Sequence, residues 1–244
     1  MAVSRARARE SVRTTRALVL RRTEYGEADL VLSIFTEAFG KISALARGAR
    51  KSTRRFAGSL EAMHTLELRL EERPTSELFA VREARIVAPR MGLTSSLERL
   101  EAAGRALSWV RSGAPARTPE PELWEEITTL LDRLAARDSE LDPARLLATS
   151  GLRILAMLGW GLDFERCVRC GKECPPGQPA LIDPGKGGLV CRSCGGARQR
   201  LDAARRARLA RAARDGDPAA LEADDAKVAL DLVERVLKAH AGIE

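Results

Sequence analysis

The sequence predicts an α+β protein in which a small β-barrel precedes an α-helical domain that carries an inserted metal-binding segment. Short apolar runs fill residues 14–87, leucines at helical spacing begin after Pro89, and two C-x-x-C-G copies interrupt the helical pattern. With 244 residues and 45% hydrophobic content, the chain is long enough for one large or two ordinary domains with real cores. We divide it into a basic tail (1–13), a barrel (14–88) and a helical domain (89–244) with a metal insert (164–197).

The barrel prediction depends on five apolar runs, several of which alternate with polar residues as half-buried strands do. These runs cover residues 15–22, 29–37, 41–47, 64–72 and 77–87. Five strands in under eighty residues are typical of a small barrel. The connection over residues 48–62 is too long for a hairpin turn, and we expect a helical turn within it.

The helical domain is predicted from apolar residues spaced three and four apart, which packed helices require. A first helix carries Leu93, Leu97, Leu100, Leu107 and Val110, and a second carries Leu123, Trp124, Ile127, Leu130, Leu131 and Leu134. A third runs from 142 to 160, where Asp142 can cap, Pro143 fits the first position and Leu141 can pack back. Two further helices are expected over residues 198–216 and 224–242. The loop between the first two is 112–122.

Two turns share the pattern C-x-x-C-G, "CVRCG" at 167–171 and "CRSCG" at 191–195, and together they predict a metal site. A C-x-x-C turn presents two thiolates to one ion, and two such turns complete a tetrahedron. The expected ligands are Cys167, Cys170, Cys191 and Cys194. Zinc is the expected ion, one per chain, with an iron–sulfur cluster or disulfides as alternatives. Four protein ligands leave no open coordination position, so the ion is expected to be structural.

The fifth cysteine, Cys174, is an alternative ligand in place of Cys170, although it would break the symmetry of the two turns. Residues 179–190 between the turns predict a short hairpin with glycines at its tip.

Catalytic signals are weak. The two histidines, His64 and His240, stand in no triad or ligand pattern, and the chain has no phosphate-binding glycine loop in a strand-and-helix context. We therefore expect a protein that is not an enzyme.

Positive charge is concentrated in the first quarter of the chain. Residues 1–60 hold thirteen Lys/Arg and five Asp/Glu, a net charge of +8, whereas the remaining 184 residues have a net charge of −1. Such a bias suits a polyanion, with nucleic acid or an anionic membrane face as candidates and a solvated tail as the alternative for the leader arginines. No signal peptide precedes the barrel, and no apolar run approaches the ~18 residues of a membrane helix, so we expect a cytoplasmic protein.

Three stretches resemble the RecO family of bacterial recombinational repair proteins. They are residues 15–52 with their "YGEAD" turn and "FGKISALARGARK" segment, the "FAGSLEAM" stretch at 56–63, and the two cysteine turns with "GGLVC" before the second. The match covers most of the chain in the expected order. The basic leader before Ser11 and the extra Cys174 depart from the family pattern, which leaves open where the DNA surface begins and which thiols bind the metal.

The resemblance implies an N-terminal OB-fold barrel and a helical domain that carries a zinc knuckle in many members. It also implies a mediator that binds single- and double-stranded DNA, anneals strands coated with single-stranded DNA-binding protein (SSB), and works with RecR to load RecA. We expect the acidic SSB tail to bind the helical domain, no membrane contact, and a nucleoid-associated protein.

The residues agree with a DNA-binding barrel, because an OB fold holds a phosphate backbone with clustered cations. The segment "RGARKSTRR" places five positive charges within nine residues. The expected DNA-binding residues are Arg21, Arg22, Tyr25, Lys41, Arg47, Arg50, Lys51, Arg54 and Arg55. Aromatics make up only 4%, and Phe35, Phe39, Phe56 and Phe79 are candidates for the core, so binding should be mainly electrostatic.

Three alternatives stay open at this point. The DNA surface could instead involve the leader arginines or a basic helix around Arg205, Arg206 and Arg208. The chain could be a nucleic-acid-modifying enzyme with a structural zinc, or a zinc-ribbon module that binds a protein partner. A DNA-binding assay and a strand-annealing assay separate these possibilities.

Overall fold

The structure, a computed structural model, describes residues 12–52, 54–56, 59–72, 76–136 and 142–241. The chain forms two compact units. The barrel unit contains Met1–Met91 and Ala114–Trp124, and the helical unit contains Gly92–Gly113 and Glu125–Glu244. We describe each unit by itself.

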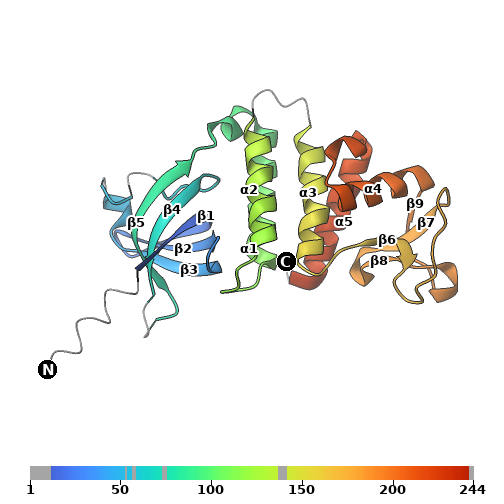
Figure 1. Cartoon of the computed structure of the whole chain (residues 1–244), viewed down its shortest axis with the longest axis horizontal. Coiled ribbons are helices and arrows are strands. Elements are labelled where there is room, and N and C mark those ends of the chain that lie inside the picture. Colours follow the sequence, from blue (N-terminus) through green and yellow to red (C-terminus); the bar gives the residue numbers. More distant parts are fainter. Residues whose placement is uncertain (1–11, 53, 57–58, 73–75, 137–141, 242–244) are drawn as a thin grey trace. The chain divides into compact units, whose positions relative to one another are not determined.

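The barrel unit is a closed five-stranded barrel, as predicted (Figure 1). Its strands are β1 (Val12–Tyr25), β2 (Asp29–Thr36), β3 (Gly40–Ala46), β4 (Thr65–Glu71) and β5 (Phe79–Ala88). Their order around the barrel is β1-β2-β3-β5-β4, with β3 and β5 parallel and all other neighbours antiparallel. This is the arrangement of an OB fold. Strand β1 includes Val12 and Arg13, which the sequence analysis placed in the basic tail.

The barrel core is formed by the apolar side chains that alternate with polar ones along each strand. On β3, Ile42, Ala44 and Ala46 are buried in the interior, so the neighbouring side chains, including Lys41 and Ser43, lie on the outer face. The helical turn expected in the long connection is η1 (Ala49–Lys51). Beyond it, Phe56 and Leu60 return to the barrel core. The cationic connection is therefore anchored at both of its ends.

Residues 114–124, predicted as a loop with the start of a helix, belong to the barrel unit. The N–H of Arg117 donates to the carbonyl of Lys41 over 2.8 Å, and Trp124 packs on Phe35 with ring centroids 5.8 Å apart. Gly40, with φ +65°, is required at this contact, because a Cβ there would lie 1.8 Å from the Thr118 carbonyl oxygen. The segment thus covers part of the outer face of β2 and β3.

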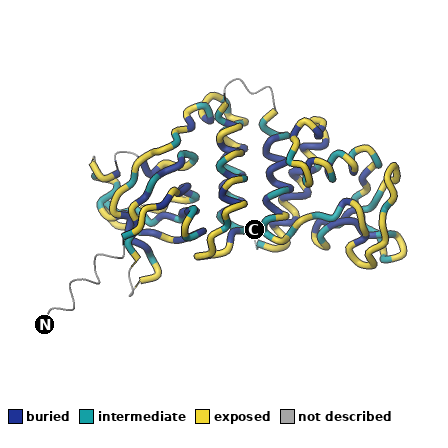
Figure 2. Tube along the Cα trace, viewed as in Figure 1, coloured by how far each residue is buried: buried dark blue, intermediate teal, exposed yellow. Residues whose placement is uncertain are grey.

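The described residues also form five α-helices. They are α1 (Leu97–Gly113), α2 (Pro121–Ala135), α3 (Pro143–Met157), α4 (Ala203–Asp215) and α5 (Ala223–Ala241). Helix α3 packs against α1, α4 and α5 and is the darkest of the helices in Figure 2. As predicted, Asp142 caps it by accepting from Ala144 N, with Pro143 at the first position. Leu141 lies outside the described residues.

Two helical predictions differ from the structure. Leu97 and Leu100 are 68% and 37% exposed, because the buried side of α1 begins only at Ala102. Residues 199–201 form strand β9 (Gln199–Leu201) rather than the start of a helix. They pair with a strand of the metal segment, and Asp202 caps α4 directly afterwards, so the helix begins only at Ala203.

Candidate metal centre and nucleic-acid interface

A small sheet brings the two cysteine turns together. Its strands are β6 (Asp163–Cys167), β7 (Ala180–Asp183), β8 (Gly188–Leu189) and β9, in the order β6-β8-β7-β9. Strands β7 and β8 are the predicted hairpin, with the short 3-10 turn η3 (Pro184–Lys186) at its tip. Because β6 and β8 run parallel with Cys167 opposite Leu189, each cysteine turn leaves the same end of two adjacent strands. We call this sheet with its two turns the metal module.

The four predicted ligand sulfurs lie within 4.8 Å of one another. Cys170 Sγ and Cys191 Sγ are 3.8 Å apart, which is about the S···S separation around a tetrahedral ion with metal–sulfur bonds of ~2.3 Å. All five cysteines are free thiols, so the disulfide alternative has no support. The arrangement fits one ion bound by four thiolates.

The surroundings of the thiols also favour a cation. The pKa of the Cys167 thiol is lowered to about 6, first because the backbone N–H of Cys191 donates to its Sγ over 3.3 Å, with further hydrogen bonds from the first cysteine turn. Hydrogen bonding with Cys191 and Cys170 raises the pKa of Cys194 to about 12. Neighbouring thiolates repel one another, so the four thiols do not all ionise by themselves. A bound divalent cation would offset this repulsion and allow all four to ionise.

Cys174 is half-buried and lies outside this four-sulfur group. Its backbone is already engaged, because its N–H donates to the Glu165 carbonyl over 2.7 Å and its own carbonyl accepts from Arg206 over 3.0 Å. The geometry supports the symmetric set of four over a site in which Cys174 replaces Cys170.

Arg206 of α4 fastens the metal module to the helices. Its buried guanidinium donates to the carbonyls of Phe164, Cys174 and Pro175 at 3.0, 3.0 and 2.7 Å. Phe164 lies three residues before the first cysteine ligand, and the other two carbonyls follow the first turn. A single side chain thus holds both flanks of that turn.

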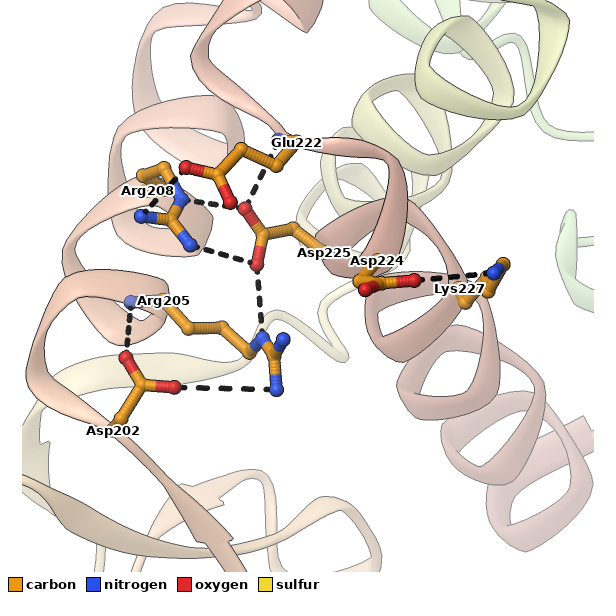
Figure 3. Close-up of polar contacts among 7 residues, drawn as sticks. All are labelled: Asp202, Arg205, Arg208, Glu222, Asp224, Asp225 and Lys227. Carbon is orange, nitrogen blue, oxygen red and sulfur yellow. Dashed lines mark hydrogen bonds and ion pairs between the residues drawn. The ribbon is translucent and has the colours of Figure 1, made fainter.

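The neighbouring arginines of α4 are held by a buried carboxylate, as Figure 3 shows. Asp225, fully buried at the start of α5, accepts from Arg205 Nε over 2.9 Å, from Arg208 Nε over 2.5 Å and from the Glu222 N–H over 3.0 Å. Burial opposes ionisation of Asp225, but the hydrogen bonds from Arg208 and Arg205 outweigh it and hold its pKa at about 2. This ion-pair cluster locks α4 to α5.

The geometry therefore does not favour the alternative DNA surface around Arg205, Arg206 and Arg208. A basic helix exposed to solvent would leave these guanidinium groups available to phosphates. Instead, Arg205 and Arg208 are paired with Asp225, and Arg206 is buried on three carbonyls. The sequence gives no sign of this, because Asp225 stands seventeen or more residues after the arginines it pairs with.

The predicted DNA-binding residues of the barrel unit fall into two groups. In the first, cations already have carboxylate or backbone partners. Arg22 pairs with Glu61, Arg50 Nη1 lies 3.1 Å from Glu24 Oε2, and Lys51 Nζ lies 3.9 Å from Glu27 Oε2. Arg55 donates to the carbonyl of Arg47 over 2.9 Å and lies over the Phe56 ring. Lys41 is half-buried on the outer face of β3.

The second group consists of exposed cations without such partners. Within the described residues, the side chains of Arg21, Arg47 and Arg54 have no hydrogen bond or ion pair. Arg21 shares the outer face of the barrel with Ser33 and Ser43, its register neighbours on β2 and β3. Tyr25, at the end of β1, is 62% exposed. These four residues are available to a ligand.

The basic connection and the turn between β1 and β2 are joined. Gly48 N–H donates to Asp29 Oδ1 over 2.7 Å, and Arg50 N–H donates to the Ala28 carbonyl over 3.0 Å. Tyr25, Arg47 and Arg54 are thereby presented by two segments that support each other. Of the phenylalanines named as core candidates, Phe35, Phe56 and Phe79 are buried and Phe39 is half-buried against the core, which leaves Tyr25 as the exposed phenyl ring among the described residues of the barrel unit.

Fold and site together define a class: an OB-type barrel with unpaired cations, joined in one chain to a helical unit that carries a four-thiol metal module. Comparison with known proteins then identifies the family. The model for the recombination protein O N terminal domain matches residues 11–90, and that for its C terminal domain matches residues 94–244.

Curated relatives agree with the two family models. A DNA repair protein RecO from Anaeromyxobacter sp. (strain Fw109-5) is 35% identical over 179 residues, 72% of this chain and 68% of that protein. Proteins of the same name from Myxococcus xanthus and Geobacter metallireducens are 36% and 32% identical, over 73% and 76% of this chain and 71% and 73% of theirs. The chain belongs to the RecO family of DNA repair proteins, as its motifs predicted. Among the described helices, none is long and apolar enough to cross a membrane.

Proposed function

We propose that this protein binds single- and double-stranded DNA, anneals complementary strands coated with SSB and, with RecR, helps to load RecA. Membership of the RecO family supports this role. The observation that carries it is the set of exposed side chains on the barrel unit, Arg21, Tyr25, Arg47 and Arg54, of which the three arginines have no partner among the described residues. The setting for this activity would be the cytoplasm, at the nucleoid.

Binding of this kind would be electrostatic and independent of sequence. Guanidinium groups contact phosphates, which are the same in every strand, and a single stacking ring accepts any base. A factor that pairs two arbitrary complementary strands needs this tolerance, because it must hold each strand without selecting its bases. The partially neutralised connection, with Arg50 and Lys51 paired to glutamates, would keep that hold weak enough to release the annealed duplex.

The metal is proposed to be one structural zinc per chain. Cys167, Cys170, Cys191 and Cys194 would hold it, and four sulfur ligands would leave no position for water or substrate. The ion would close the ends of β6 and β8 and so stabilise the metal module.

We propose no catalytic role for the chain. Its histidines are engaged in packing, since His64 Nδ1 accepts from Arg90 N over 3.1 Å and His240 stacks on Trp160.

For SSB, we propose that its acidic tail, which ends in phenylalanine, binds the helical part of the chain, residues 89–244. The chemistry requires an apolar hollow edged by cations. Calorimetry of the full chain with the tail peptide should show saturable binding, and hydrogen exchange should show protection within residues 89–244. Protection confined to the barrel strands would contradict this placement.

Strand annealing tests the proposed function directly. Two complementary oligonucleotides, one labelled with a donor and one with an acceptor dye, are mixed with and without SSB. The full chain should accelerate annealing of both naked and SSB-coated strands, and the rate should fall as salt rises. If the chain leaves the rate unchanged in both cases, or binds neither DNA form in a mobility assay, the proposal is wrong.

A further inference from the structure

A strongly cationic hollow lies in the helical unit, between the metal module and helix α5. Its volume is about 560 Å³, and its lining includes four cations and a single carboxylate. The cations are Lys186, Arg192, Arg198 and Arg235, and the carboxylate is Asp183. They come from the hairpin, the second cysteine turn, the stretch after it and helix α5.

Two of the cations are held in place. Arg235 Nη1 lies 2.7 Å from Gln199 Oε1 and 3.4 Å from Asp231 Oδ2, and Lys186 Nζ lies 2.9 Å from Asp183 Oδ2. The lysine lowers the pKa of Asp183, first through that hydrogen bond, and the charge of Arg235 lowers it further. Asp183 is therefore ionised and offsets the charge of Lys186, and Asp231 lies beside Arg235 in the same way, so the uncompensated positive charge belongs to the other two cations.

The other two cations are exposed and unpaired. The side chains of Arg192 and Arg198 have no hydrogen-bond or ion-pair partner in the part of the chain that the structure describes. Like charges gathered without counter-ions repel one another, so a site of this kind gains free energy when an anion enters. The two unpaired guanidinium groups at this hollow therefore favour an anionic ligand.

The fold of the second cysteine turn sets the positions of both unpaired arginines. Arg192 opens the 3-10 turn η4 (Arg192–Cys194), and the N–H groups of Gly195 and Gly196 donate to the carbonyls of Arg192 and Cys191, each over 3.0 Å. Both glycines have positive φ, 98° and 65°, which turns the chain back so that Arg198 reaches the same hollow. The metal-binding turn thus doubles as a support for two guanidinium groups.

We propose that this hollow binds phosphate groups of a nucleic-acid backbone and is a second DNA contact of the chain. Guanidinium groups suit phosphates because their donors match two oxygens at once. Few of the side chains that line the hollow are apolar, Leu181 and Ile182 being the largest, so a phosphate backbone suits it better than a peptide with large apolar anchors. The inference rests on the proposed DNA binding and adds a site to it.

The experiment measures DNA binding of the full chain by fluorescence anisotropy over a range of salt. Arg192→Ala/Arg198→Ala should lower the slope of log K against log salt by roughly 1.4 for a mixed-sequence single strand, at ~0.7 per lost phosphate contact. The control Arg211→Ala/Arg214→Ala removes the same charge from α4, outside the hollow, and should change the slope much less. Arg192→Lys/Arg198→Lys should retain most of the wild-type slope.

Other outcomes separate the possible failures. If the wild-type chain binds no DNA, the proposed function itself fails. If the wild type binds but the hollow and control variants give equal slopes, the second contact is wrong and the proposed function stands. Arg192 could instead balance the thiolate charge, so metal content is measured in parallel. If the double variant loses metal, Arg198→Ala alone, outside the cysteine turn, decides the matter with an expected slope change of about 0.7. Lost binding of a polyglutamate peptide with unchanged DNA binding would also overturn the inference.

Discussion

Arg50 Nη1 lies 3.1 Å from Glu24 Oε2, so the middle of the most basic stretch of the chain is paired with the end of strand β1 beside it. Lys51 is paired in the same way with Glu27. A cation in such a pair must give up its carboxylate before it can contact a phosphate fully. Cations of equal charge in this stretch therefore differ in what they can contribute to DNA binding, and the difference can be measured.

Replacing the unpaired cations should weaken DNA binding more than replacing the paired ones. Arg47→Ala/Arg54→Ala should lower the single-strand salt slope by roughly 1.4, about equally for every sequence, because two phosphate contacts are lost. Arg50→Ala/Lys51→Ala is the matched control with the same charge change and a smaller expected effect. Circular dichroism should show both variants folded, since all four side chains are exposed. Equal slope changes would mean that the glutamate pairs do not restrain these cations.

Tyr25 is expected to act as a stacking platform for unpaired bases. Its ring is 62% exposed at the end of β1. Tyr25→Ala should weaken single-strand binding by about 1 to 3 kcal/mol, whereas duplex binding should change little because duplex bases are already stacked. Tyr25→Phe keeps the ring and should bind like the wild type. A loss in Tyr25→Phe equal to that in Tyr25→Ala would assign the role to the hydroxyl group.

The features that the sequence predicted are those that depend on local patterns. Alternation marks the barrel strands because inward positions such as Ile42 and Ala44 must be apolar. The repeated C-x-x-C spacing marks the four thiols because two short turns suffice to present them. These signals need no knowledge of distant contacts.

The features that the sequence did not reveal depend on pairings between distant residues. The arginines of α4 resemble a solvated basic helix, and only the fold brings the buried Asp225 between them. Residues 114–120 lack any strand or helix period, and their packing on the barrel depends on the space that Gly40 leaves. The hollow at Arg192 and Arg198 combines four segments, none of which is unusually basic alone. The one sequence signal for this hollow is the glycine pair Gly195 and Gly196, because two glycines after a cysteine turn allow the chain to change direction there.

Metal binding should depend on four cysteines and not on the fifth. Elemental analysis should find about one zinc per wild-type chain. Cys167→Ser and Cys191→Ser should lose the ion and destabilise the metal module, because a thiolate is missing from the tetrahedron. Cys174→Ser is the matched control and should retain the ion, since Cys174 lies outside the four-sulfur group. Loss of zinc in Cys174→Ser, with retention in a Cys170→Ser variant, would show that the fifth cysteine is a ligand.

The Asp225 carboxylate should be a major source of stability for the helical unit. Asp225→Asn removes the negative charge between Arg205 and Arg208 and leaves two like charges facing each other (Figure 3). Breaking a buried pair costs about 3 to 5 kcal/mol, and we expect the lower end because these arginines are 29% and 26% exposed. Urea unfolding followed by helix circular dichroism at pH 7 measures this cost. Asp224→Asn, beside it but 75% exposed, should stay within about 0.5 kcal/mol of wild type.

The same carboxylate predicts how stability depends on pH. The pKa of Asp225 in the folded chain, about 2, lies below the ~3.9 of an unfolded aspartate, so ionised Asp225 favours folding. Its contribution, roughly 2 to 3 kcal/mol, is fully present above about pH 5 and is lost as the pH falls from 5 toward 2. Wild type should therefore lose more stability than Asp225→Asn between pH 5 and pH 2.5, because the asparagine has no proton to take up. Parallel pH profiles for the two proteins would show that the Asp225 carboxylate is not held ionised by its arginines.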